Sequence, residues 1–225
     1  MSAQRNSDSV PAASSSSWQS ARLLVTDEFA APPVILRVGD SVIGTLGNFS
    51  ASTGKAKSKK TFNVCAIVAA AMTGGTVLNY SASLPPRKRR ILYVDTEQSR
   101  FHCKRVLCRI LRLAGLPTDA HPPLLEFLCL RGYATKERLR KIEEAIYDLD
   151  NLGLVVIDGI RDLAHDINSP GEATDLITKL MQWTDERRIH IHTVLHLNKG
   201  DDNTRGHLGT ELNNKAETVL QITKD

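Results

Sequence analysis

Several features that define other classes of protein are missing from this sequence of 225 residues. No apolar run approaches the roughly 20 residues that a membrane-spanning helix needs, and the N-terminus lacks the apolar core of a secretory signal. The four cysteines lie in apolar or helical contexts without the spacing of metal ligands, so we expect reduced thiols. These absences predict a cytoplasmic protein that does not enter a membrane.

Further absences bear on the type of site. His190, His192 and His196 recur along one segment, but no acidic or cysteine partners give them the spacing of metal ligands. No loop carries the aromatic side chains that stack on single-stranded bases. No lid segment is recognisable, and this weakens the hypothesis of a small-molecule kinase.

What is present fits one folded domain with a tail. The chain is 41% hydrophobic and 24% charged, which is typical of a globular protein. Residues 1–22 are rich in serine and alanine, and we expect them to be disordered. The domain then covers residues 23–225. Its first part, up to residue 46, mixes short apolar pieces with prolines and predicts an irregular lead-in.

The net charge of +4 is small, but the basic residues gather in two clusters, 55–60 and 87–90. Such clusters suit anionic partners such as nucleotides or nucleic acids. The alternative is that they form solvated loops.

Short apolar runs alternate with helical patterns along the chain. Strands are predicted at about 48–53, 91–95, 125–130, 154–157, 192–197 and 218–222, and helices at about 62–72, 99–114 and 139–149. A further helix begins at Pro170, with Ser169 as N-cap and Glu172 closing a capping box. This alternation predicts an α/β fold of three layers with a mostly parallel central sheet.

The stretch from Gly54 to Thr61 reads GKAKSKKT and joins a predicted strand to a predicted helix. It approaches the phosphate-binding P-loop pattern G-x-x-x-x-G-K-[ST], with Lys60 and Thr61 in place and Lys59 where the second glycine belongs. In such a loop, backbone N–H groups and the helix start converge on phosphate oxygens. The alternative is a solvated lysine-rich loop. The candidate nucleotide-binding residues are Gly54, Lys55, Ala56, Lys57, Ser58, Lys59, Lys60, Thr61 and Phe62.

Polar residues follow other predicted strands, and ligands of parallel sheets bind at the carboxyl ends of strands. Asp158 ends the run LVVID, where a carboxylate can lie near Mg²⁺; otherwise it caps a turn. Glu97 follows ILYVDT and is the favoured general base for a water molecule. Asp95 competes for that role, because strand alternation places both acids on one face.

The last group of candidates follows the fifth predicted strand. His196 could sense the γ-phosphate together with Asn198, or could be a hydrogen-bonded residue at the sheet edge. Lys199 and Arg205 lie in the polar loop that follows. Either cation could reach a neighbouring subunit's phosphate, contact a nucleic-acid backbone or be solvated.

Taken together, GKAKSKKTF, ILYVDTEQS, VVIDGIRDL and HLNKGDDNTRGHLGTELNNKAETVLQI resemble the RecA-type P-loop ATPase core over about residues 40–223. These segments are most similar to those of DnaB-like and plasmid RepA-like helicase ATPases encoded by bacterial mobile or mobilisable elements. The resemblance implies ATP and Mg²⁺ as ligands, single-stranded DNA as a partner, and a homo-oligomer, often a six-membered ring with ATP between subunits.

The resemblance also implies roles for residues. Lys60 would bind the β- and γ-phosphates, Thr61 and Asp158 would hold Mg²⁺, and Glu97 would be the catalytic glutamate. His196 matches the polar residue that ends the sensor strand, and Arg205 lies near a trans-acting arginine. The two nucleic-acid loops would correspond to about 161–168 and 199–207.

The leading hypothesis is therefore an Mg²⁺-dependent, helicase-like ATPase acting on or beside DNA in replication or mobilisation of a mobile element. The alternative is a nucleotide-binding regulator or DNA-binding adaptor with little hydrolysis, which the altered P-loop favours and Glu97 disfavours.

Overall fold

The structure is a computed structural model that describes residues 17–197 and 206–223. It divides into two units, residues 1–31 and 32–225. The described part of the first unit contains the 3-10 helix η1 (Ser17–Ala21) and a turn in which the Leu24 amide donates to the Asp27 carboxylate. The tail boundary predicted after residue 22 stays a prediction.

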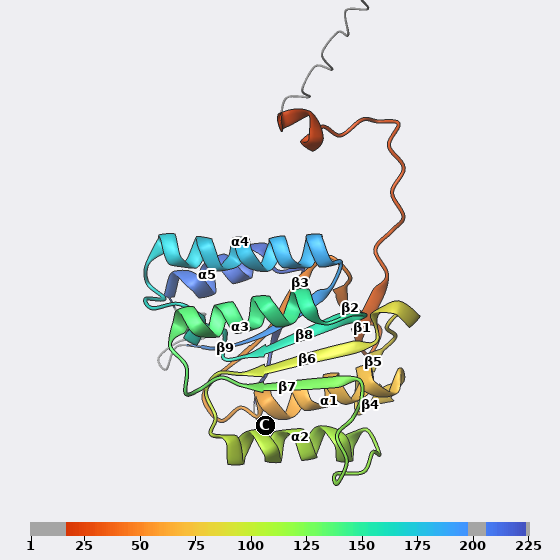
Figure 1. Cartoon of the computed structure of the whole chain (residues 1–225), viewed down its shortest axis with the longest axis vertical. Coiled ribbons are helices and arrows are strands. Elements are labelled where there is room, and N and C mark those ends of the chain that lie inside the picture. Colours follow the sequence, from red (N-terminus) through yellow and green to blue (C-terminus); the bar gives the residue numbers. More distant parts are fainter. Residues whose placement is uncertain (1–16, 198–205, 224–225) are drawn as a thin grey trace, which may run out of the picture. The chain divides into compact units, whose positions relative to one another are not determined.

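The second unit is built on a six-stranded sheet in which every paired neighbour is parallel, in the order β10-β3-β9-β8-β6-β7 (Figure 1). Its strands are β3 (Phe49–Gly54), β6 (Arg90–Asp95), β7 (Leu125–Cys129), β8 (Leu152–Asp158), β9 (His190–His196) and β10 (Thr218–Gln221). Strand β8 is buried along its whole length, as its apolar run predicts, and so is β3, although β3 carries Ser50, Ser52 and Thr53.

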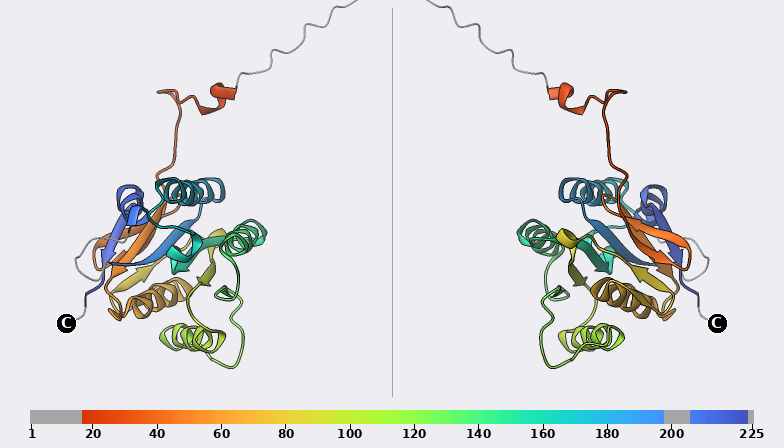
Figure 2. Two further views of the ribbon diagram at one scale, coloured as in Figure 1. Left: turned by 90° about the vertical axis from the view of Figure 1, so that its left-hand side faces the viewer. Right: turned by 90° about the vertical axis from the view of Figure 1, so that its right-hand side faces the viewer.

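Helices cover both faces of this sheet (Figure 2). The helices are α1 (Lys60–Thr73), α2 (Arg100–Leu113), α3 (Thr135–Asp148), α4 (Pro170–Arg187) and α5 (Gly206–Lys215), with short 3-10 turns η2 (Pro86–Lys88) and η3 (Ile160–Leu163). Helices α1 and α2 bury apolar residues in one core, and α3, α4 and α5 in the other. The predicted three-layer, RecA-like α/β class is confirmed.

Local sequence signals explain several helix ends. Gly74 ends α1 in the left-handed region (φ 67°), where a glycine has no steric cost. The Ser169 hydroxyl accepts a hydrogen bond from the Glu172 amide at 3.4 Å and caps α4. The predicted closure of that capping box is wrong, because the Glu172 carboxylate accepts from the amides of His165 and Asp166 instead.

A small antiparallel sheet lies where the sequence predicted an irregular lead-in. Its order is β2-β1-β5-β4, and its strands are β1 (Val34–Val38), β2 (Ser41–Thr45), β4 (Thr76–Val77) and β5 (Tyr80–Ala82). The turn between β1 and β2 uses Gly39, whose φ of 53° suits glycine. Leu36 and Ile43 are buried in the core on the side of α1. The expectation of irregular structure is therefore wrong for residues 34–45.

Helix α5 is the second element that the sequence pattern did not predict. Its glycines and asparagines are poor helix formers, so residues 206–215 resemble loop sequence. Leu208 and Leu212 are nevertheless fully buried, and they belong to the same core cluster as the buried residues of α4. Tertiary packing therefore stabilises a helix against its local preference.

A buried polar chain joins β3 and β9 to the small sheet. The Ser50 hydroxyl lies 2.7 Å from His190 Nε2 and 2.8 Å from His192 Nδ1, and Ser52 Oγ lies 2.8 Å from His192 Nε2. His190 Nδ1 donates to the Thr45 carbonyl at 2.8 Å. Burial lowers the pKa of His190 to about 4 and that of His192 to about 3, so both imidazoles are neutral.

No helix in the described ranges is both long and apolar enough to cross a membrane.

Candidate functional site

Four adjacent strands bring the predicted site residues to one edge of the sheet. In the register of β3 and β9, Gly54 lies beside His196, and in that of β8 and β6, Asp158 lies beside Asp95. Strand β9 lies between β3 and β8, so the P-loop and both carboxylates share the carboxyl edge of the sheet.

The loop between β3 and α1 has two residues with positive φ, and one of them, Lys59, stands where the P-loop pattern has its second glycine. Lys59 has φ 65° and ψ 25°, and Lys57 also has φ 65°. A residue with a Cβ adopts this left-handed region at a cost of about 1–2 kcal/mol. Lys59 therefore keeps a conformation that glycine adopts more easily, and its side chain stays exposed to solvent.

Lys60 begins α1, and only 5% of its surface is exposed. Its Nζ donates to the carbonyls of Gly54 at 2.7 Å and Lys55 at 2.8 Å, so the ammonium lies inside the loop. Burial lowers the pKa of Lys60, and the negative charges of Asp158 and Glu97 partly oppose this shift. The result is a desolvated cation held in the loop between β3 and α1.

Asp158 lies at the end of β8 with one oxygen shared by two hydroxyls. Thr61 Oγ1 donates to Asp158 Oδ2 at 3.0 Å, and Tyr93 OH donates to the same oxygen at 2.9 Å. Burial raises the pKa of Asp158 to about 6, and the charge of Asp95 adds to the rise, while both hydrogen bonds lower it. The carboxylate is thus oriented and poorly solvated.

The two acids after β6 have different surroundings. Asp95 is fully buried and accepts from the amides of Glu97 (3.0 Å) and Gln98 (2.7 Å) and from Gln98 Nε2 (2.7 Å). Asp95 therefore holds the turn. The Glu97 side chain is 40% exposed, with Oε2 3.6 Å from His196 Nε2. The neighbouring His196 lowers the pKa of Glu97, and burial partly opposes this shift.

A close contact between two strand ends supports that turn. Thr96 Oγ1 donates to the Gly159 carbonyl at 2.8 Å and lies 3.1 Å from Asp162 Oδ2. Gly159 has φ 102°, and a Cβ there would lie 2.2 Å from Thr96 Oγ1 and 2.9 Å from Glu97 Cγ. Glycine is required here because the chain after β8 passes directly against the turn that carries Glu97.

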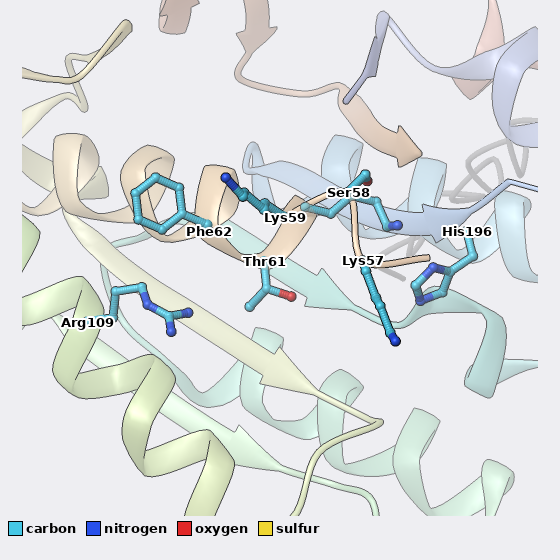
Figure 3. A pocket seen from close by; sticks show the side chains of 8 residues that line it. Lys57, Ser58, Lys59, Thr61, Phe62, Arg109 and His196 are labelled. Carbon is cyan, nitrogen blue, oxygen red and sulfur yellow. The ribbon is translucent and has the colours of Figure 1, made fainter. Parts of the chain in front are cut away.

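These elements enclose a cavity of about 530 Å³ (Figure 3). Its lining residues are Lys57, Ser58, Lys59, Lys60, Thr61, Phe62, Arg109 and His196. Ser58 Oγ and His196 Nδ1 are buried polar atoms without a hydrogen-bond partner within the described residues. Because buried polar atoms are normally paired, the cavity is suited to a polar ligand. Its volume falls in the range of small-molecule sites, about 300–1,000 Å³.

Sequence reasoning missed two residues of this region. Tyr93 lies within the apolar strand β6 and is fully buried. The only indication in the sequence was its hydroxyl group, which needs a hydrogen-bond partner when it is buried. Arg109 belongs to α2, between the buried positions Val106 and Ile110, and extends toward the P-loop residues (Figure 3). No motif marks it, because only the packing of α2 beside α1 brings it to the cavity.

Other predicted residues lie away from this cavity or outside the described ranges. Asn198, Lys199 and Arg205 lie outside the described residues, as does most of the loop at 199–207. The other predicted nucleic-acid loop, 161–168, begins within η3, and Arg161 is exposed there. Within the described ranges, no group of three His, Cys, Asp or Glu side chains is placed to hold a metal by itself.

The chain was compared with family models and with curated proteins. A family model described as an AAA domain matches residues 19–202, which is most of the chain. No curated protein matches the sequence. The match covers the P-loop, both strand-end carboxylates and His196.

Proposed function

The chain belongs to the AAA domain family of P-loop ATPases, and on this premise we propose that it binds ATP with Mg²⁺ and hydrolyses it to ADP and phosphate. One observation carries the proposal: the buried ammonium of Lys60 and the unpaired Ser58 hydroxyl lie at a cavity of about 530 Å³ beside two carboxylates. A triphosphate supplies the anionic charge that pairs with the ammonium and an acceptor oxygen for the Ser58 hydroxyl.

In this proposal the loop residues from Gly54 to Phe62 cradle the phosphates. Lys60 exchanges its two carbonyl partners for β- and γ-phosphate oxygens, and the amides at the start of α1 point to the same anion. Arg109 contacts the nucleotide from the side of α2, because it lines the same cavity.

The donor set of Thr61 and Asp158 fits Mg²⁺, which prefers hard oxygen ligands. Their oxygens are 3.0 Å apart, and Tyr93 donates to the same carboxylate oxygen as Thr61. We propose that Thr61 and Asp158 hold the ion, directly or through water. When bound, Mg²⁺ neutralises charge on the β- and γ-phosphates.

Glu97 is the proposed general base. Its pKa is lowered, so the carboxylate is ionised at neutral pH, and one of its oxygens lies 3.6 Å from His196 Nε2. Asp95 does not suit this role, because both of its oxygens already accept hydrogen bonds within the turn. A positioned base of this kind contributes about 10²–10⁴-fold to a rate.

The first test is ATP turnover of the purified protein with Mg²⁺, measured as phosphate release. Glu97→Gln is expected to lower kcat by about 10²-fold or more while ATP binding is retained. Lys60→Ala is expected to abolish ATP binding, whereas Lys136→Ala, an exposed lysine on α3, serves as the matched control. Negligible turnover by the folded wild-type protein, with and without DNA, would refute the ATPase proposal.

We further propose that the protein acts on or beside single-stranded DNA in replication or mobilisation of a mobile element. The sequence resemblance to helicase ATPases and the basic clusters support this. A homo-oligomer, as a ring, is proposed for the same reason, with ATP between subunits and Arg205 or Lys199 reaching the neighbour's phosphate. Stimulation of turnover by single-stranded DNA and an ATP-dependent rise in molar mass are the corresponding measurements.

A second candidate function is a nucleotide-binding regulator or adaptor with little hydrolysis. It is favoured by one observation, the Lys60 ammonium held by its own loop carbonyls beside a strained Lys59. The two functions differ in the cell: Glu97→Gln leaves a regulator working and inactivates an ATPase.

A further inference from the structure

Helix α2 carries a concentration of positive charge that ATP hydrolysis does not require. Its sequence, RFHCKRVLCRILRL, contains five Lys or Arg residues and no Asp or Glu. Within the described ranges, no carboxylate forms an ion pair with any of these five cations. Uncompensated charge on one helix costs stability through mutual repulsion, so an anionic partner is expected.

The cations lie on the outer side of the helix. Val106 and Ile110 are buried in the core, whereas Lys104, Arg105 and Arg112 are exposed. Figure 1 shows α2 as an outer helix on the α1 face of the sheet. A surface hollow of about 520 Å³ follows this side, and its lining residues are Lys104, Arg105, Cys108, Arg109, Arg112 and Leu113.

An exposed aromatic ring lies at the start of the same helix. Phe101 is 69% exposed, and its ring meets that of His102 edge-on with centroids 5.3 Å apart. Three and four residues later come Lys104 and Arg105, so the ring and the cations share one side of the helix. The helix from Arg100 to Arg112 rises about 18 Å, which is the length of several nucleotides.

We propose that this α2 surface, defined by Phe101, Lys104, Arg105 and Arg112, binds single-stranded nucleic acid. The cations contact successive phosphates and Phe101 stacks on an unpaired base, the combination by which proteins hold single strands without sequence preference. An anionic membrane suits the surface less well, because the apolar side of α2 is buried in the core and is not free to insert. An acidic polypeptide would leave Phe101 without a partner.

The proposal concerns a surface separate from the two nucleic-acid loops implied by the sequence. Arg109 lines both this hollow and the cavity at the P-loop, so a bound strand would lie next to the nucleotide. The inference extends the DNA-binding part of the proposed function and in that respect rests on it. Binding can nevertheless be measured without ATP, so the two can fail separately.

The experiment measures binding of fluorescein-labelled dT20 to the full chain without nucleotide, over a range of NaCl concentrations. The triple variant Lys104→Gln/Arg105→Gln/Arg112→Gln is expected to bind at least tenfold more weakly at low salt. The slope of log K against log [NaCl] should become shallower by about 2, because each lost phosphate contact removes about 0.7. Phe101→Ala should weaken binding about five- to hundredfold and leave the slope unchanged.

The matched control is Lys136→Gln/Arg140→Gln/Lys141→Gln on α3, which removes the same charge from the opposite face of the sheet. It should bind dT20 as the wild type does. All variants should unfold cooperatively on heating and keep basal ATP turnover, which shows that they are folded. The α2 triple variant should unfold at or above the wild-type temperature, because mutual repulsion on the helix is removed.

Several results would overturn the proposal: no binding of dT20 by the wild type, an equal loss in the α3 control, or equal affinity for a duplex together with a silent Phe101→Ala. Loss of binding to poly-glutamate or to phosphatidylserine vesicles in the α2 variant, with dT20 binding intact, would assign the surface to another partner. Binding of dT20 that depends on α2 in a protein without ATP turnover would refute the ATPase and retain this inference.

Discussion

Lys59 shows how a single residue can depart from a motif while its backbone conforms. The residue keeps φ 65° at the position where P-loops carry glycine, and its side chain is exposed. The steric cost of that conformation is local and of the order of 1–2 kcal/mol. The Lys59 side chain makes no capping hydrogen bond to α1, so it does not offset this cost.

Lys59→Gly is therefore expected to stabilise the protein by about 1 kcal/mol, since removal of strain outweighs the greater flexibility of the unfolded chain. Urea denaturation measures the change, and ATP affinity should stay within about twofold because Lys60 supplies the phosphate contact. Ala56→Gly in the same loop, at a residue without positive φ, is the control and should give no gain. A loss of stability in Lys59→Gly would contradict the strain argument.

Asp158 combines a proposed role in metal binding with a cost to stability. Its pKa of about 6 lies above the 3.8 of an exposed aspartate, so the ionised group disfavours folding. Stability from this residue is complete below about pH 4 and is lost as pH rises through about 6.

Asp158→Asn should consequently raise the free energy of unfolding by roughly 2 kcal/mol at pH 7, with the gain vanishing near pH 4. Hydrolysis of ATP should be lost. Urea denaturation at both pH values, without Mg²⁺, checks the first part. An Asn variant less stable than wild type at pH 7 would show that the hydrogen bonds from Thr61 and Tyr93 matter more than desolvation.

At the scale of elements, the agreement between sequence and structure depends on how local each signal is. The sequence predicted β3, β6, β8 and α3 within a few residues. Their signals are local, because a strand buried on both faces or a helix buried on one face repeats similar residues at a regular spacing. The strands β1 and β2 were missed because Pro32, Pro33 and Gly39 suggested irregular structure. Helix α5 was missed because its stability comes from packing on other elements.

For the site residues too, the success of the prediction depended on how local each signal is. The sequence alone predicted that five side chains lie close together, because each lies at or after the end of a recognisable strand and strand ends of a parallel sheet meet at one edge. These residues are Lys60, Thr61, Asp158, Glu97 and His196. Arg109 and Tyr93 could not be found, because their positions depend on the packing of α2 and on a contact across β6 and β8. The choice between Asp95 and Glu97 also required the hydrogen bonds of the turn.

The histidine pair of β9, His190 and His192, makes the sheet sensitive to acid. Because burial lowers both pKa values below the usual 6.5, their contribution to stability is complete above pH 6.5 and is lost as pH falls toward 4. Between pH 7 and 5, we expect a loss of roughly 3 kcal/mol.

The measurement is best made in Asp158→Asn, which removes the opposite titration of the aspartate. Urea denaturation at pH 7, 6 and 5 gives the slope, and His102→Gln, an exposed histidine on α2, is the control that should not change it. A flat profile in the Asp158→Asn background would mean that the network accepts a proton without unfolding.

For the whole molecule, the P-loop links ligand binding to the stability of both cores. Strand β3 and helix α1 flank the loop, and their buried residues divide between the two apolar clusters. A ligand held there favours the folded state of the whole second unit.

ATP at 100 times its dissociation constant should therefore raise the free energy of unfolding by about 2.7 kcal/mol. Chemical denaturation with and without Mg²⁺ and ATP measures the effect in Glu97→Gln, where turnover is low. Lys60→Ala should show no stabilisation, and Lys136→Ala should show all of it. Equal stabilisation of the Lys60 variant would place the nucleotide elsewhere on the molecule.

The conformation of Lys59 also bears on how the P-loop motif is defined. A sequence pattern with glycine before the lysine names the residue that adopts a positive φ most easily. The backbone angle itself can be met by another residue. This chain adopts a positive φ with Lys59 and therefore does not match the sequence pattern. A definition based on the left-handed dihedral after a buried strand, followed by Lys-Thr at a helix start, includes both forms.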